Sequence, residues 1–117
     1  MATRVPSKPA VVPLAAALRQ KLGLPRRTFS RLTGFSERVI AQWENGKAMS
    51  EPSLRRLREV ERLRDRLAEV VKPDVIPKWL DTPNLAFDGL KPLEVVERGE
   101  VDQLWQMIFF LESGVAS

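Results

Sequence analysis

The sequence predicts an all-α fold, and three features of its pattern carry that prediction. Apolar residues recur three and four positions apart over several stretches, which is the spacing of one face of a helix. Proline and glycine stand between these stretches, where helices begin and end. No stretch alternates apolar and polar residues as a half-buried strand would. Since 44% of the 117 residues are apolar, the chain can bury a modest core, in one compact domain or two very small ones.

The first thirteen residues are predicted to form a flexible basic arm, because three prolines, Arg4 and Lys8 occur there without any helical period. A first helix is expected over 14–22, with Gly23 as its stop. The apolar residues at helical spacing in this segment are Leu14, Ala17, Leu18 and Leu22.

Two short helices joined by a tight turn should follow. Pro25 suits the first position of the earlier helix, and Gly34 permits a left-handed turn after it. Ser36 is a natural N-cap for the later helix, which is expected from Glu37 to about Asn45. The residues expected to face inward are Phe29, Leu32, Ile40 and Trp43.

A longer fourth helix is expected from about Pro52 to Val71, with Pro73 as its stop. Its apolar stripe consists of Leu54, Leu57, Val60, Leu67 and Val70. The other positions mix arginines with acidic residues, which most simply makes a solvated, salt-bridged face. Contact with a DNA backbone and packing in a dimer are the alternatives for these arginines.

Beyond Pro73 the pattern predicts short helices broken by prolines and glycines, namely Pro77, Pro83, Gly89, Pro92 and Gly99. Thr82 can cap a turn that begins at Pro83, and residues 82–84 are interpreted as scaffold that positions Trp79. Pro92 can open a helix that Gly99 closes, and Asp102 suits the positive end of the last helix. The predicted inward stripe of that helix is Leu104, Trp105, Ile108 and Leu111.

Charge is divided unevenly along the chain. Residues 1–72 hold 16 Lys and Arg against 7 Asp and Glu and carry +9, whereas residues 73–117 hold 3 against 8 and carry −5. A basic surface attracts the phosphates of nucleic acid, and an acidic one favours a basic protein pocket. We therefore predict an arm over 1–13, one domain over 14–72 and a second over 73–117. The alternative is a single domain with unevenly charged helix faces.

Composition excludes several classes of site. The chain has no Cys and no His, which rules out thiolate and imidazole metal ligands, disulfides, and catalysis by either side chain. No pair of acidic residues stands in a context that suggests a shared buried cleft, so neither an enzyme nor a metal or cofactor site is expected. No apolar run is long enough to cross a bilayer and no signal peptide opens the chain, so a cytoplasmic protein is expected.

Residues 24–47 contain small, turn-forming and apolar residues at a specific set of spacings. The register places Ser30 where two helices touch, Gly34 in the turn, Phe35 as a core plug, Ser36 as a cap, then Ile40, Trp43 and Glu44-Asn45-Gly46-Lys47. With it, residues 14–70 resemble the helix-turn-helix of the phage-repressor (Xre) family. The resemblance implies that the chain binds operator DNA. Pro25 and Arg26 depart from the family, which usually has Ser or Thr and then Gln at these positions.

In that family's geometry the second paired helix lies in the major groove, where its first turn and next outward position reach base edges. These positions are Glu37, Arg38 and Gln42: Arg38 can take guanine, Gln42 can read adenine, and Glu37 can accept from cytosine or orient Arg38. The residues expected to contact phosphates flank the groove at helix ends, and are Arg26, Arg27, Ser36, Asn45 and Lys47. Because Glu37 places negative charge toward DNA, a module kept only for packing is the alternative.

A second series of motifs occupies the carboxy-terminal part. In order, they are Trp79-Leu-Asp-Thr-Pro-Asn84, Pro92-Leu-Glu94, Gly99-Glu100 and Ser113-Gly114. With these motifs, residues 74–117 resemble the toxin-binding domain of the Xre/MbcA/ParS antitoxins. The resemblance implies a type II antitoxin that neutralises a toxin of the NAD-consuming RES family and represses its own operon.

The last helix and the residues after it are the expected toxin contacts. Met107, Phe109 and Phe110 widen the apolar surface of that helix beyond one face, so Met107 and Phe110 are predicted either to meet the toxin or to pack in the core. In the family, the end of the antitoxin is presented to the active-site cleft of the toxin. The resemblance assigns that role to Glu112, Ser113, Gly114, Val115, Ala116 and Ser117, and an ordinary frayed terminus is the alternative.

A single helix-turn-helix unit binds DNA weakly, so a homodimer, or a larger complex with the toxin, is expected. Two other functions are compatible with the sequence. One is a stand-alone Xre-family transcriptional regulator whose carboxy-terminal domain senses a ligand or a protein, which predicts a stable pocket. The other is an adaptor that has lost DNA binding, which predicts no salt-dependent affinity for DNA.

Overall fold

The computed structural model describes residues 13–114, which form seven α-helices and two short 3₁₀ helices and contain no strand. The elements are α1 (Leu14–Leu22), α2 (Arg26–Thr33), α3 (Glu37–Glu44), α4 (Glu51–Leu67), η1 (Pro73–Val75), α5 (Ile76–Leu80), η2 (Leu85–Phe87), α6 (Pro92–Glu97) and α7 (Val101–Glu112). The predicted all-α fold is confirmed. Of the predicted basic arm, only Pro13 lies within the described residues.

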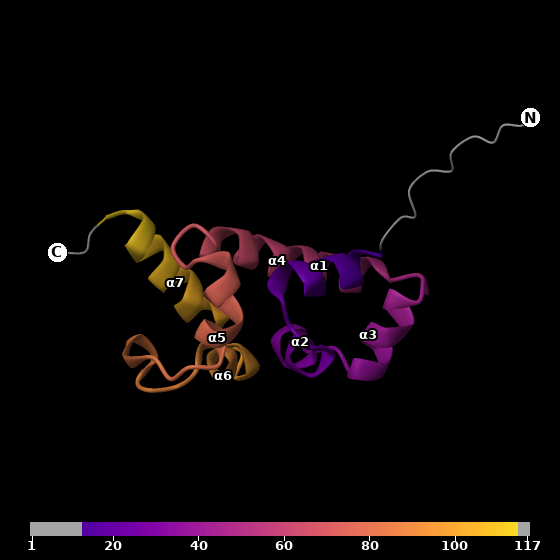
Figure 1. Ribbon diagram of the computed structural model, residues 1–117, viewed down its shortest axis with the longest axis horizontal. Coiled ribbons are helices and arrows are strands. Elements are labelled where there is room, and N and C mark those ends of the chain that lie inside the picture. Colours follow the sequence, from indigo (N-terminus) through magenta and orange to yellow (C-terminus); the bar gives the residue numbers. More distant parts are fainter. Residues whose placement is uncertain (1–12, 115–117) are drawn as a thin grey trace, which may run out of the picture.

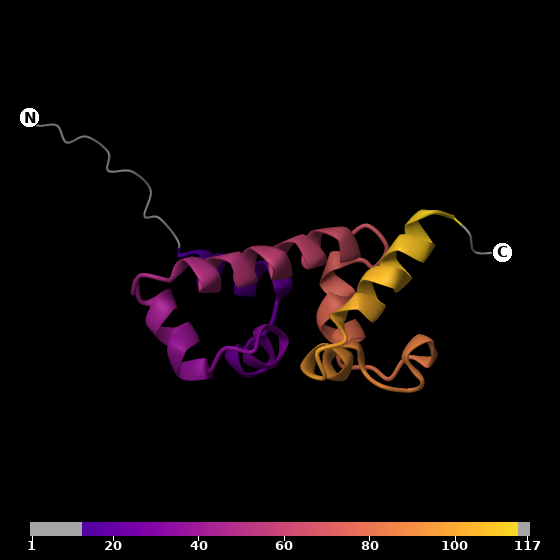
Figure 2. The same ribbon diagram turned by 180° about the vertical axis from the view of Figure 1, so that it is seen from behind.

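The molecule is elongated, and α4 runs along one side of it with α1 beside it (Figure 1). Helix α3 lies at one end and α7 at the other, and the view from behind agrees (Figure 2). One continuous hydrophobic core joins both ends and includes Leu18, Phe29, Leu57, Ile76 and Leu104. Contacts between α2 and α6 and between α4 and α7 carry this core across the predicted domain boundary at Lys72.

The first three helices lie close to their predicted positions. Helix α1 has the predicted bounds and ends at Gly23, but Ala15 is its buried alanine and Ala17 is exposed. Pro25 has extended backbone with ψ 161° and is the N-cap of α2, so it precedes the first helical position predicted for it. Ser36 caps α3 as predicted, because its Oγ accepts a hydrogen bond of 3.1 Å from the Val39 amide.

Helix α4 is shorter than its apolar period predicts. Ser50 caps its start, and the helix ends at Leu67 instead of Val71. The amides of Val70 and Val71 both donate to the Leu67 carbonyl, at 3.0 and 2.8 Å. This tight turn folds both valines back against the core, so their apolar character does not mark a further turn of helix.

The carboxy-terminal helices correct two predictions and confirm a third. Pro77 lies in the first turn of α5, where a missing N–H is tolerated, and so does not break a helix. Asn84 is the cap of η2, since its Oδ1 accepts from the Ala86 amide at 2.9 Å, while the Thr82 hydroxyl donates to the Lys78 carbonyl. Helix α6 begins at Pro92 as predicted, and Gly99 follows it with φ 79°.

In α7, the predicted inward stripe is only partly buried. Leu104 and Ile108 are buried and Trp105 is half-buried, whereas Leu111 is 45% exposed. Leu111 lies in the last turn of α7, which extends to the free end of the molecule (Figure 1). The helical period predicts which side chains share one face of a helix, but it does not predict whether another helix covers that face at its last turn.

Candidate DNA interface and carboxy-terminal surface

The turn between α2 and α3 is fixed by hydrogen bonds from both sides. Gly34, with φ 84°, donates its amide to the Ser30 carbonyl at 2.8 Å, and the Ser30 hydroxyl donates to the Phe35 carbonyl at 2.6 Å. From α4, Arg56 Nε donates to the Thr33 carbonyl at 3.1 Å. The turn therefore holds α3 at a defined angle to α2, as reading a DNA groove requires.

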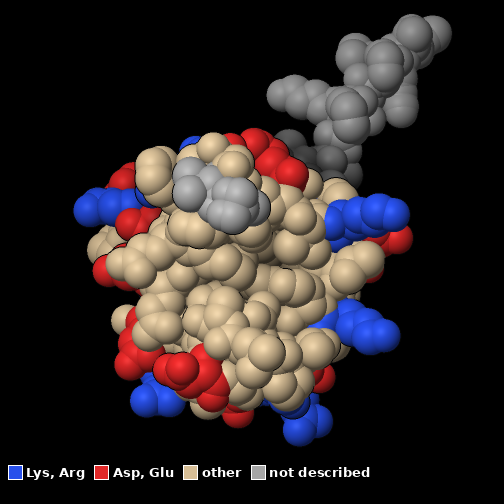
Figure 3. All heavy atoms as spheres, turned by 90° about the vertical axis from the view of Figure 1, so that its left-hand side faces the viewer, with Lys and Arg blue, Asp and Glu red and all other residues tan. Residues whose placement is uncertain are grey.

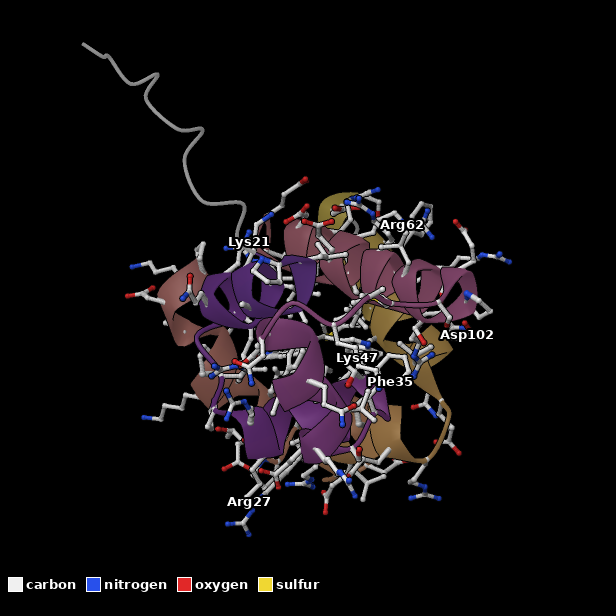
Figure 4. The ribbon with its side chains drawn as sticks, turned by 90° about the vertical axis from the view of Figure 1, so that its right-hand side faces the viewer. Lys21, Arg27, Phe35, Lys47, Arg62 and Asp102 are labelled. Carbon is white, nitrogen blue, oxygen red and sulfur yellow. The ribbon has the colours of Figure 1, made fainter. Side chains whose placement is uncertain are left out.

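Phe35 packs against the core, as predicted, but is not enclosed by it. It is half-buried and packs with an edge-to-face geometry on Trp43, with ring centroids 4.7 Å apart. Figure 4 views the α3 end of the molecule and shows Phe35 beside α3. Trp43 is the buried member of the pair, so Phe35 acts as a cover over the recognition helix.

The predicted base-reading residues project from α3. Glu37 and Arg38 are exposed in its first turn, whereas Gln42 is half-buried and its Oε1 accepts a long hydrogen bond of 3.4 Å from Lys47 Nζ. Figure 4 looks onto α3 and shows Lys47 beside it and Arg27 projecting at the lower edge of the same view. The predicted phosphate contacts Arg26, Arg27, Ser36, Asn45 and Lys47 are all exposed.

Arg26 has a second role that the sequence pattern did not indicate. Its Nε and Nη2 both donate to Glu44 Oε1, at 2.9 and 2.7 Å, because the start of α2 lies against the end of α3. Arg19 on α1 donates to the same carboxylate, with Nε 2.6 Å from Oε2. Of the three guanidinium nitrogens of Arg26, only Nη1 has no protein partner within residues 13–114, and its contact with phosphate stays a prediction.

The Glu44 side chain is 6% exposed and holds three helices together through these two arginines. The hydrogen bonds from Arg19, and then those from Arg26, hold the pKa of the Glu44 carboxyl below its ordinary value, although burial opposes this shift. The charged triad fixes the far end of α3, while the Ser36 cap fixes its start. Both ends of the recognition helix are thereby positioned before any DNA is bound.

The α7 end of the molecule has a different character. Figure 3 views this end and shows a broad uncharged area, with Lys, Arg, Asp and Glu gathered around its edge. Leu85 is 93% exposed at the tip of η2, and Phe109 and Phe110 are 71% and 52% exposed on α7. An open hollow of about 490 Å³ lies between η2 and α7, lined by Ala86, Phe87, Gln103, Gln106, Met107, Phe110 and Leu111. An apolar centre with a charged rim is typical of a protein interface.

The predicted flexible tail begins later than the sequence suggested. Glu112 is the last residue of α7, and Arg66 at the end of α4 donates Nε and Nη2 to its two carboxylate oxygens, the Nε bond being 2.9 Å long. This pairing lowers the pKa of the Glu112 carboxyl. The Ser113 hydroxyl donates to the Phe110 carbonyl at 2.8 Å. Glu112 and Ser113 are therefore held at the helix end, and Val115, Ala116 and Ser117 lie outside the described residues.

Between the described ends of the chain, no helix is long and apolar enough to cross a bilayer. Within the same residues, no cluster of acidic side chains is arranged to hold a metal ion.

Comparison with protein families matches residues 16–63 to a helix-turn-helix family. The chain carries a helix-turn-helix domain. Over 97 residues it is 29% identical to the mycobacterial cidal antitoxin MbcA of Mycobacterium tuberculosis and of Mycobacterium bovis, which covers 82% of this chain and 86% of MbcA. The crystal structure of the M. tuberculosis MbcT–MbcA toxin–antitoxin complex contains a similar chain, with TM-score 0.71, 25% identity, and coverage of 94% of this chain and all of that one.

These findings confirm both resemblances that the sequence motifs indicated. The helix-turn-helix domain contains α1 to α3 and most of α4, and the likeness to MbcA extends well beyond it. The chain is a homologue of an antitoxin over most of its length.

Proposed function

We propose that the protein is an antitoxin that neutralises a toxin through the α7 end of the molecule and represses its operon through the helix-turn-helix domain. The observation that carries this proposal is the placement of α3 and α7 at opposite ends of one continuous core (Figure 1). With this arrangement a toxin can occupy one end while the other remains free for DNA. The homology to MbcA supports the assignment of the α7 end to a toxin.

At the DNA end, Glu37, Arg38 and Gln42 read bases. Arg27, Ser36, Asn45 and Lys47 contact phosphates, and Arg26 adds its free Nη1 while it remains bound to Glu44. Operator recognition by two such units requires a homodimer. The protein has no catalytic role in this proposal, and it acts in the cytoplasm, where operator DNA is found.

At the toxin end, Met107 and Phe110 are the apolar anchors beside the hollow, and residues 112–117, which begin at the end of the same helix, are the further toxin contacts. Exposed aromatic residues in an uncharged area are the usual anchors of protein interfaces. The proposed partner is a RES-family toxin, whose cleft for an NAD phosphate group would suit an acidic carboxy terminus.

The test is a search for a toxin gene beside this one, followed by co-expression of the two proteins. The full chain should co-purify with the toxin and restore growth, and should bind promoter DNA with an affinity that falls as salt rises. A chain that ends at Gly114 should lose neutralisation and keep its stability, because it retains the Arg66–Glu112 pair. DNA binding without any toxin partner would instead identify a stand-alone regulator.

A further inference from the structure

The loop between α5 and α6 presents an apolar side chain that no other part of the described chain covers. Leu85 in η2 is 93% exposed, the largest exposed fraction among the large apolar residues of 13–114. A single exposed leucine is ordinary on a protein surface. Its meaning depends on how rigidly the loop holds it and on what lies beside it.

The loop is fixed on both sides of Leu85. The Asn84 amide donates to the Leu90 carbonyl across the loop, and the Asn84 carbonyl accepts from the Phe87 amide, both at 3.0 Å. Phe87 is buried and packs edge-to-face on Trp79, with ring centroids 6.5 Å apart. Phe87 thus anchors η2 to the core while Leu85 is held outward. A side chain on a preorganised loop gives up little conformational entropy when a partner covers it.

The residues that follow Leu85 form one wall of the hollow of about 490 Å³ between η2 and α7. Ala86 and Phe87 line it from η2, and Met107 and Phe110 line it from α7. Two glutamines are the polar part of this lining, which includes no charged residue. Leu85 and the hollow are therefore a knob and a recess, side by side on the uncharged end of the molecule (Figure 3).

We propose that Leu85 is a docking residue for the toxin. It inserts into an apolar pocket on the toxin surface, while an apolar side chain of the toxin fills the hollow. The toxin is the occupant because the hollow is continuous with Met107 and Phe110, which the proposed function assigns to it, and because this end lies away from α3 and stays uncovered when DNA is bound (Figure 1).

The chemistry of the hollow also indicates which part of the toxin it meets. A charged group buried there would find no opposite charge in the lining, so an uncharged apolar patch fits and a basic cleft does not. The proposal rests on the proposed antitoxin function and divides its toxin surface in two. Leu85 and the hollow dock the toxin beside its cleft, and residues 112–117 occupy the cleft.

Leu85→Ala should weaken binding to the toxin found by the gene search by at least about tenfold, because burial of a leucine side chain contributes that factor or more. The variant should unfold at the wild-type temperature, since the side chain is 93% exposed. Val75→Ala is the matched control. Val75 lies in the other 3₁₀ helix, is 40% exposed and does not line the hollow, so toxin binding should change by less than about threefold. Surface plasmon resonance measures the affinities, and circular dichroism the unfolding.

Photo-crosslinking in the co-expressed complex tests the contact itself. The photo-reactive residue p-benzoylphenylalanine in place of Leu85 should couple to the toxin, and in place of Val75 it should not. The docking role is overturned if Leu85→Ala binds the toxin as tightly as the wild type, if position 75 couples as efficiently as position 85, or if position 85 couples to a second copy of this chain instead of the toxin. In these cases the wild type still binds the toxin, so the antitoxin function stands. A wild-type chain that binds no toxin removes the antitoxin function, and the docking role with it.

Discussion

Arg38 and Arg26 both belong to the predicted DNA interface, yet their surroundings differ. Arg26 is bound to Glu44 through two nitrogens, whereas Arg38 is exposed in the first turn of α3 and forms no ion pair with another residue of 13–114. A free guanidinium at this position can give two of its N–H donors to one base. The structure thus favours Arg38 over Arg26 as the residue that selects sequence.

Arg38→Ala is expected to weaken binding to the operator by about 5- to 150-fold and to relax the preference for one base pair, as loss of a bidentate contact does. Fluorescence anisotropy at fixed salt, with the operator and a single-base variant, measures both effects. Arg27→Ala is the control for a phosphate contact. It should weaken binding to all sequences alike and reduce the slope of log affinity against log salt concentration by about 1. Equal behaviour of the two variants would remove Arg38 from base recognition.

Glu44 makes stability depend on pH. Since its folded-state pKa lies below the ordinary 4.5, its ion pairs contribute fully above that pH and are lost as pH falls through the folded-state value. Glu44→Gln should therefore lower the free energy of unfolding by about 1–3 kcal/mol at pH 7, because a neutral amide pairs with Arg19 less strongly than a carboxylate does. Urea unfolding should show this difference shrink in acid. The exposed control Glu37→Gln should stay within about 0.5 kcal/mol of the wild type at pH 7.

Helix α7 presents two aromatic residues with different neighbours. Phe110 lines the hollow beside η2, while Phe109 does not and lies on the side of Trp105. Adjacent positions on a helix point about 100° apart, so one helix can serve two partners. The same element contributes Leu104 and Ile108 to the core.

Phe110→Ala is expected to weaken toxin binding by at least about 30-fold, the effect of truncating a central interface anchor. Phe109→Ala is the matched control, because it removes the same side chain one position away, and toxin binding should change less than about threefold. Surface plasmon resonance with the immobilised toxin measures both. If Phe109→Ala has the larger effect, the toxin occupies the other side of α7.

At the scale of the whole molecule, the core is continuous across the boundary that charge predicts at Lys72. Arg31 on α2 donates to Glu97 on α6 with bonds of 2.7 and 2.8 Å, and Leu32 and Val96 belong to the same apolar cluster. The division into domains 14–72 and 73–117 remains a prediction, and the contacts between them link the two halves mechanically. A single cooperative unit follows from such contacts.

Unfolding is therefore expected in one transition. Leu104 is fully buried on α7, and Leu104→Ala should lower the free energy of unfolding by about 2–5 kcal/mol. The substitution should also lower the temperature at which the helix-turn-helix domain unfolds. Far-ultraviolet circular dichroism and loss of DNA binding on heating should give the same midpoint. Two separate transitions, with only one shifted by the substitution, would show that the halves fold independently.

Local patterns anticipated most of the helices and much of the candidate site. Caps and breakers act within a few residues, so Gly23, Ser36 and Pro92 marked their helix ends directly. The DNA-facing positions followed from the register around Gly34. The predicted end of α4 and the predicted burial of Leu111 were wrong, because both depend on which other element of the fold lies nearby.

The sequence by itself determined the helical fold, the recognition register and the antitoxin-like motifs, since each depends on residues close together in the chain. Only the tertiary structure decided which charged groups are free. Arg19 reaches Glu44 across 25 positions and Arg31 reaches Glu97 across 66, distances over which spacing carries no information. The structure likewise shows that Arg26 is bound to Glu44 and that Glu112 is bound to Arg66, which no local pattern indicated.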